Sequence, residues 1–346
     1  MTRRFARYRR PLAMLVAATL IGVGGVEYAH HVRWAGALET LRHVSLPLLL
    51  LATGFHFLSL MAKARVWLVC LRALGAIDYG AAARATFVGA TLNSLFVGSA
   101  GEAGRVVIMT RSSGLRAHAV LTTVALERLL NSAGFVVVLC VALLITPMPS
   151  SVGRAALVAG ALVVIAVTLT LRSDRRSVRP PGSARRACRF QRIMRVTVRR
   201  VRRNMVRILT LRRLALAVPL TLLDWTCQLA SYHLAALAAH LPLGITGSLV
   251  ALLAVNVGLV IRVTPGNLGV FELAYAGAAH SLGAPKDAAL AVGLLIHLAQ
   301  DIPTMVLGLA AGWRLAFAPN RAPGSAPGQP VVAHSRIPSL SSGETP

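Results

Sequence analysis

The stretch TPGNLGVFE at residues 264–272 interrupts a long run of hydrophobic sequence with a proline, two glycines and a carboxylate. In a lipid bilayer, irregular backbone survives only where protein or a water-filled cavity covers its N–H and C=O groups. A glutamate in such a place is costly and is a candidate functional group. A second interruption of the same kind, GSAGEAGR, lies at residues 98–105. Two glycine-rich, charged breaks in one hydrophobic chain are typical of the substrate site of a transporter.

The composition of the chain indicates a membrane protein. Its 346 residues are 55% hydrophobic and 14% charged, with a mean hydropathy of +0.66. A soluble protein of this length could not hide so much apolar sequence. Several stretches approach or exceed the roughly 20 apolar residues that cross a bilayer. They lie at residues 12–28, 44–61, 119–145, 155–171, 214–241 and 288–313.

The net charge of +26 is concentrated outside these stretches. Sixteen arginines fall within residues 172–213, and five more lie among the first ten residues. Basic residues gathered beside apolar spans are typical of the cytoplasmic face. The sequence beside the arginines supplies no base-reading fold, so we expect no nucleic-acid binding. We expect a multi-pass protein of the cell inner membrane with a cytoplasmic N-terminus.

With the arginines on the inside, two segments must each begin and end on one face of the membrane. They are residues 80–97 and 245–283, and each contains or adjoins one break. Each can be a re-entrant hairpin or a pair of short helices. The predicted fold is therefore an all-α integral membrane protein with about six full transmembrane helices and two broken or re-entrant elements, eight hydrophobic elements in all. Broken elements that enter from opposite faces suggest inverted repeats.

The chain divides into a polytopic membrane domain over residues 1–317 and a Pro-, Ser- and Gly-rich tail over residues 318–346, which we expect to be disordered. Within the Arg-rich loop at 172–213, residues 189–209 place apolar side chains at helical spacing and arginines on the other face. A basic amphipathic helix of this kind binds an anionic lipid surface. The alternative is that these arginines only fix the topology.

Four motifs in order along the chain point to a known family. They are GEAGR at 101–105, ALERLLN at 125–131, TPGNLGVFE at 264–272 and HLAQDIPTMVLGL at 297–309. Together they resemble the membrane region of lysylphosphatidylglycerol synthases, which also occurs alone in flippase-like membrane proteins. The chain departs from that pattern at residues 97–100, where a proline is expected, and at Asn131, where a carboxylate is expected. The resemblance covers the membrane region and does not include the soluble aminoacyl-transferase domain that full synthases carry.

The resemblance implies that the protein moves lipids between leaflets. The residues give a physical reason for the same expectation, because a headgroup phosphate must cross apolar space and an arginine fork binds phosphate oxygens while staying protonated. The arginines nearest the breaks have glutamates as natural counter-charges. The candidate substrate-binding residues are Glu102, Arg105, Glu127, Arg128, Arg262, Pro265, Gly266, Gly269 and Glu272.

Five of these residues also have a structural interpretation. Glu102 with Arg105, and Glu127 with Arg128, could form static ion pairs within their own segments, and Arg262 could reach the nearest headgroups. His297 and Asp301, one helical turn apart, could relay protons. Like Asp224 and Gln228, they could instead hold helices together. Asn93 and Asn256, upstream of the breaks, are candidate partners for exposed backbone groups.

We therefore expect a lipid transporter that moves an anionic or polyprenyl-type lipid, with membrane lipids as its partners. The alternative is a membrane component of an aminoacyl-, glycosyl- or hopanoid-type lipid-modifying pathway. Further copies of the chain or a biosynthetic enzyme are possible protein partners. A third hypothesis is a scaffold whose Arg-rich loop recruits a partner. The sequence holds none of the common catalytic motifs, so we expect no enzyme activity, no cofactor and no metal. Its four cysteines have no CxxC spacing.

Overall fold

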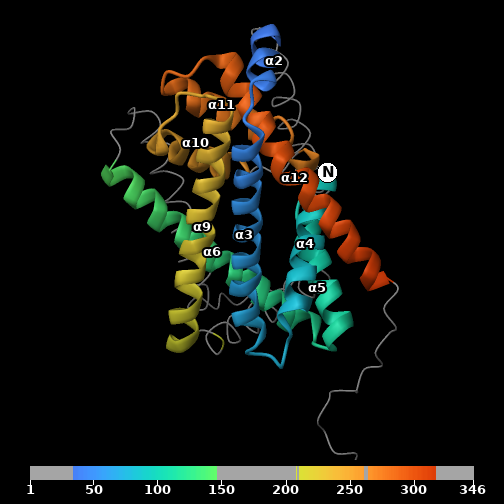
Figure 1. Ribbon diagram of the computed structural model, residues 1–346. Helices are drawn as coiled ribbons and strands as arrows, with labels where there is room; N and C mark the ends of the chain where they lie inside the picture. The colour runs from blue at the N-terminus through green and yellow to red at the C-terminus, as the bar shows by residue number, and fades with distance from the viewer. Residues whose placement is uncertain (1–33, 146–207, 209, 261–263, 317–346) are drawn as a thin grey trace, which may run out of the picture.

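The computed structural model describes residues 34–145, 208, 210–260 and 264–316 (Figure 1). The predicted spans at 12–28 and 155–171 lie outside the described residues. So do the tail at 318–346, Arg262, and the proposed amphipathic helix at 189–209 apart from Ile208.

Four described helices are long and apolar enough to cross a membrane. They overlap the predicted spans at 44–61, 119–145, 214–241 and 288–313, and the described secondary structure is helical throughout. These helices are α3 (Leu46–Leu71), α6 (Ala117–Ile145), α9 (Leu211–Ala238) and α12 (Lys286–Ala316). The expectation of an all-α membrane protein is confirmed for this part of the chain.

Short helices fill the intervals between the long ones. α4 (Tyr79–Leu95) and α5 (Ala100–Ser113) flank the first break. α10 (Ile245–Gly258), the 3₁₀ turn η1 (Pro265–Asn267) and α11 (Val270–Ser281) surround the second break. A further short helix, α2 (Trp34–Arg42), packs against α12. The order long, short, short, long therefore occurs twice. The predicted segment at 245–283 is a pair of short helices, whereas the segment at 80–97 is the single helix α4, which forms a pair only with α5 beyond it.

Contacts along the helices fix their relative directions. The N–H of Ser45 donates to the carbonyl of Ala238 across 2.8 Å, and the Ser59 hydroxyl meets Asp224, so α3 and α9 are antiparallel. Figure 1 shows these two helices side by side through the middle of the molecule. The two sets of four helices therefore begin with long helices that run in opposite directions, as an inverted repeat requires.

The second long helix of each set follows the same rule. α12 runs parallel to α3, because Thr53 bonds the carbonyl of Ala299 and His56 meets Thr304. α6 runs parallel to α9, because Leu126 and Ala217 line one small cavity and, further along both helices, Phe135 packs on Trp225. These relative directions agree with those predicted from the arginines.

The first break is a tight turn between two closely packed helices. Gly98 has a φ of +86°, a conformation that favours glycine. After the turn α5 returns antiparallel along α4, with Gly101 against Gly89 so closely that a Cβ at position 101 would overlap the Gly89 carbonyl oxygen. The small residues of the GSAGEAGR stretch therefore let two backbones touch.

The second break needs three special backbone conformations within four residues. Gly266, Asn267 and Gly269 all have positive φ values, of +60°, +58° and +85°. Gly269 is the N-cap of α11, and Glu272 in the first turn accepts its N–H, which is the half of a capping box that a glycine N-cap allows. The glycines and the glutamate of this motif thus have local backbone roles.

α12 contains Pro303 within its length. A proline lacks the N–H that would bond the carbonyl four residues earlier, here Ala299. The Thr53 hydroxyl of α3 lies 3.4 Å from that carbonyl oxygen, but its single proton has a nearer acceptor in the Leu49 carbonyl of its own helix, at 3.0 Å. α3 therefore lies against α12 at the proline.

Candidate functional site

The two breaks meet at the C-terminal end of α4. The Asn93 side chain accepts the N–H of Gly101 across 2.9 Å, and its amide nitrogen lies 3.4 Å from Glu102 Oε1. A methyl group at Gly266 would lie 3.0 Å from the carbonyl oxygen of Ser94. Neighbouring residues of α4 thus touch the first break on one side and the second break on the other. The prediction for Asn93 is confirmed, whereas Asn256 donates to the Leu252 carbonyl of its own helix.

Four charged residues form two ion pairs between α5 and α6. Arg105 Nη1 lies 2.8 Å from Glu127 Oε2, and Arg128 pairs with Glu102. The sequence interpretation paired each glutamate with the arginine beside it on its own segment. That pairing is wrong, because α5 and α6 face one another and each carboxylate lies closer to the arginine across the interface. We call these four residues the arginine cluster.

Arg105 is the buried member of the arginine cluster, with a side chain only 9% exposed. Its guanidinium carbon lies 3.9 Å from the centre of the Trp67 ring, and Trp67 is held by a 3.0 Å hydrogen bond from its Nε1 to Thr123. Within the described part of the chain, Nε and Nη2 of Arg105 have no hydrogen-bond partner. Since Nη1 faces Glu127, the edge that carries the other two nitrogens is left to bind something else. Trp67 was not among the predicted site residues.

Three further residues form the histidine cluster, between α11 and α12. Nδ1 of His297 lies 2.7 Å from Glu272 Oε1, and Nε2 lies 3.4 Å from Asp301 Oδ2. The Phe271 ring stacks on the imidazole, with centroids 4.5 Å apart and planes 19° apart. Because the two carboxylates lie at opposite edges of the imidazole ring, they do not converge on a point where a metal ion would sit.

The sequence-predicted residues therefore form two groups. Glu102, Arg105, Glu127 and Arg128 come together around α5 and α6. Glu272, His297 and Asp301 come together beside the second break, which Pro265, Gly266 and Gly269 shape. The groups lie on the two sides of Asn93 and Ser94. Arg262 lies outside the described residues.

A third polar site lies between the long helices. Asp224, almost fully buried, accepts hydrogen bonds from Ser59 at 2.5 Å, Asn131 at 3.0 Å and Gln228 at 3.0 Å. The sequence anticipated the Asp224–Gln228 contact from its helical spacing. It did not anticipate the partners on α3 and α6, because neither lies near Asp224 in the chain. Donors from three helices on one carboxylate hold α3, α6 and α9 together.

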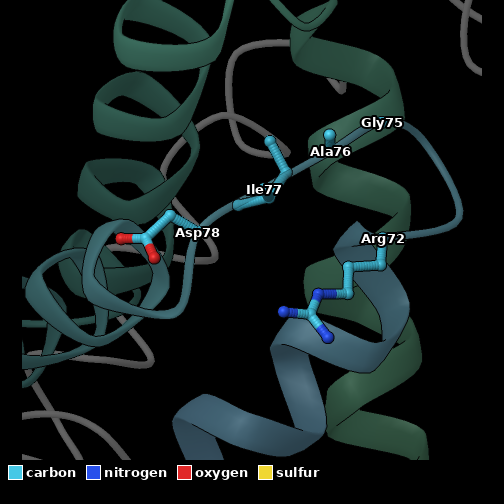
Figure 2. Close-up of a pocket in the computed structure, with 5 residues that line it drawn as sticks. All are labelled: Arg72, Gly75, Ala76, Ile77 and Asp78. Carbon is cyan, nitrogen blue, oxygen red and sulfur yellow. The ribbon is translucent and has the colours of Figure 1, made fainter.

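A shallow surface hollow lies in the loop that joins α3 to α4. Figure 2 shows the residues that line it, which are Arg72, Gly75, Ala76, Ile77 and Asp78. The Asp78 carboxylate accepts the N–H of Ala81 and caps α4. At about 1.5 Å per residue, α4 carries the chain roughly 25 Å from this loop to the first break. The hollow is therefore separate from the two charged clusters.

Comparison with known families agrees with this architecture. The family model for the lysylphosphatidylglycerol synthase TM region matches residues 12–308. No curated protein matches the chain. The matched range contains both breaks, the arginine cluster and the histidine cluster. The chain is therefore a multi-pass membrane protein of lipid-related processes, and it belongs to the family of the lysylphosphatidylglycerol synthase TM region.

Proposed function

We propose that this protein moves a phosphate-bearing lipid, of the anionic or polyprenyl type, between the leaflets of the cell inner membrane. The observation that supports it best is the meeting of the two breaks at Asn93 and Ser94, with a charged cluster on each side. Irregular backbone and buried charge at one place are costly in a membrane and are typical of a transport pathway. The N-terminus is cytoplasmic in this proposal, and the protein carries out no chemistry on the lipid.

Arg105 is the proposed phosphate ligand. The Nε and Nη2 groups that lack partners among the described residues form one edge of the guanidinium, and that edge binds two oxygens of a phosphate side by side. Glu127 and the Trp67 ring hold the guanidinium in place from its other sides. The receptor is therefore ordered before the lipid arrives, which lowers the entropy lost on binding.

Arg128 has a different place in the proposal. Its side chain is 47% exposed, whereas that of its partner Glu102 is 13% exposed. A headgroup that approaches from solvent meets Arg128 before it meets the buried Arg105. Exchange of the Glu102 carboxylate for a lipid phosphate at Arg128 would also loosen Glu102 from the first turn of α5. Binding of the lipid would in this way act on the first break.

The test is lipid movement by the purified full-length protein in vesicles of phosphatidylethanolamine and phosphatidylglycerol. Two fluorescent probes are compared, a labelled phosphatidylglycerol and a labelled polyprenyl phosphate, and dithionite quenching reports the fraction in the outer leaflet. Arg105→Lys keeps the charge but removes the two-pronged edge, so we expect at least a tenfold lower rate. Arg111→Gln removes an exposed arginine of the same helix and should retain the wild-type rate.

A normal rate in folded Arg105→Lys protein would reject the phosphate site, and no movement of either probe by wild-type protein would reject transport. Leaflet-resolved lipid analysis of cells with and without the gene distinguishes transport from a role in a lipid-modifying pathway. A lipid made in normal amount but confined to the cytoplasmic leaflet supports transport. A lipid missing from both leaflets supports a role in a lipid-modifying pathway, which the family's link to a synthase favours.

A further inference from the structure

The two breaks place a glutamate at equivalent positions. Glu102 is the third residue of α5, after the N-cap Ser99, and Glu272 is the third residue of α11, after the N-cap Gly269. Each carboxylate meets a nitrogen base on the next long helix, Arg128 on α6 or His297 on α12. Arginine stays protonated at physiological pH, whereas imidazole exchanges a proton near neutrality. The first break therefore has a partner of fixed charge, Arg128, where the second break has a partner that can gain or lose a proton, His297.

The geometry of the histidine cluster sets its proton content. Both ring nitrogens of His297 face carboxylate oxygens, at 2.7 Å to Glu272 and 3.4 Å to Asp301. A nitrogen and a carboxylate oxygen attract one another only when a proton lies between them, on either partner. With both ring nitrogens protonated, the closed cluster holds two protons, one in the hydrogen bond to Glu272 and one on Nε2, which faces Asp301 in a longer ion-pair contact. Loss of one proton leaves two lone pairs facing each other, and that contact must open.

The contact that opens is the one to Asp301. The Asp301 side chain is 31% exposed, against 6% for His297 and 9% for Glu272. It is also the longer of the two contacts. A proton that enters or leaves the cluster therefore passes through Asp301. The buried contact between His297 and Glu272 keeps its proton.

Both carboxylates of the histidine cluster lie at the second break, one bonded to it and the other in van der Waals range of it. Oε2 of Glu272 accepts the N–H of Gly269 across 2.7 Å. Oδ2 of Asp301 lies 3.8 Å from where a methyl group at Gly266 would be. Opening of the Asp301 contact therefore changes the packing of the turn at residues 265–267, which also touches α4.

Titratable groups on two neighbouring long helices lie close enough to Asp301 to interact with its charge. They are the His56 imidazole on α3 and the Tyr232 phenol on α9. The Nε2 atom of His56 lies 3.4 Å from the Thr304 hydroxyl, one turn beyond Asp301 on α12. Lys63 and Asp224 in turn interact with the charge of His56, and Tyr275 packs beside Tyr232. In the described contacts none of these five groups touches His297.

We propose that the protein is proton-coupled and that the histidine cluster is its proton site. In the closed state His297 and the two carboxylates share two protons. Release of one to water through Asp301 opens the contact to His297 Nε2 and loosens the second break, and uptake of one from water closes it again. No other atom is gained or lost in this cycle. The proposal rests on the proposed function for its cargo, but not for the proton site itself.

The test follows protons and lipid separately. Full-length protein is placed in vesicles of phosphatidylethanolamine and phosphatidylglycerol with pyranine inside and a trace of labelled phosphatidylglycerol, and a one-unit pH difference is imposed. We expect the rate of lipid movement to change at least fivefold with the gradient, together with a proton flux. A rate that ignores the gradient, with no proton flux, would overturn the proton proposal and leave transport standing. A proton flux without lipid movement would instead overturn the proposed function.

Glu272→Gln separates proton binding from a structural role. A glutamine can accept the Gly269 N–H through its oxygen and donate to His297 Nδ1 through its nitrogen, so both contacts persist without an exchangeable proton. We expect a folded protein with the same thermal midpoint in which the gradient no longer changes the lipid rate. Asp301→Asn should act likewise. His280→Gln, at the exposed end of α11, is the matched control and should keep the response. An unchanged response in Glu272→Gln and Asp301→Asn would overturn the proposal.

Discussion

The side-chain amide of Asn131 on α6 donates a hydrogen bond to Oδ2 of Asp224 on α9, across 3.0 Å. Ser59 and Gln228 both donate to the other oxygen, Oδ1. The family resemblance leads one to expect a carboxylate at position 131, and here an amide stands there. The structure accounts for the amide, because a carboxylate at 131 would face the buried carboxylate of Asp224.

An exchange of these two groups tests that account. Asn131→Asp alone places two carboxylates in contact and should lower the stability by at least about 1–3 kcal/mol. Asp224→Asn added to it restores the contact, since the amide introduced on α9 donates to the carboxylate introduced on α6, and its oxygen still accepts from Ser59 and Gln228. We expect the thermal midpoint in detergent to fall in the single variant and to recover in the double one. Equal loss in both variants would contradict the account.

The two ion pairs of the arginine cluster should differ in strength. Glu127→Gln leaves the charge of Arg105 buried without a counter-charge, and removal of one partner of such a pair costs about 3–5 kcal/mol. Glu102→Gln should cost less than about 1 kcal/mol, since Arg128 is half exposed. Thermal unfolding in one detergent compares them directly. Similar losses in the two variants would show that exposure does not separate the pairs.

Gly308 fixes the distance between α12 and α4. A Cβ there would overlap the Thr91 hydroxyl and lie 2.6 Å from the Phe87 carbonyl oxygen. We expect Gly308→Ala to separate the two helices and to lower the yield of monodisperse protein. Gly54 on α3 meets nothing within 4 Å, so Gly54→Ala should be neutral or stabilise by up to about 1 kcal/mol. Size-exclusion profiles and melting curves measure both, and a normal profile for Gly308→Ala would contradict the packing.

The orientation predicted from the arginines can be measured with single cysteines. Two single cysteines, Pro242→Cys and Ser112→Cys, are introduced into a cysteine-free background. Position 242 lies in the short exposed turn between α9 and α10, and position 112 lies at the end of α5. An impermeant maleimide added to intact cells should label position 242 and not position 112. Both positions should react after the cells are opened. The reverse pattern would invert the topology.

The long helices could be predicted from sequence because a segment that crosses the bilayer must be apolar over about 20 residues. The ends of these helices could not be predicted as well from hydropathy. The predicted span at 44–61 stops where charges begin, yet α3 continues through Lys63 and Arg65 to Leu71. The charge of Arg65 is accommodated there because its guanidinium carbon lies over the Tyr79 ring, 4.2 Å from the ring centre. Hydropathy indicates which residues contact lipid, whereas the helical hydrogen bonds of the backbone continue past the last of these residues.

Partners across helices were not predictable in the same way. The sequence placed His297 beside Asp301 because residues four apart share a helix face. It could not place His297 beside Glu272, since that contact depends on the directions and rotations of α11 and α12. The crossed ion pairs of Arg105 and Arg128 have the same cause. Spacing along one helix limits which residues can meet, but packing decides which of them do.

Pro303 has a mechanical consequence for α12. Because one backbone bond is missing there, the helix bends at that point more easily than an unbroken helix would. The arm before the proline carries His297 and Asp301, and the arm after it is anchored on α4 through Gly308. A bend at the proline would therefore change the angle between the charged arm, packed on α11, and the glycine arm, packed on α4.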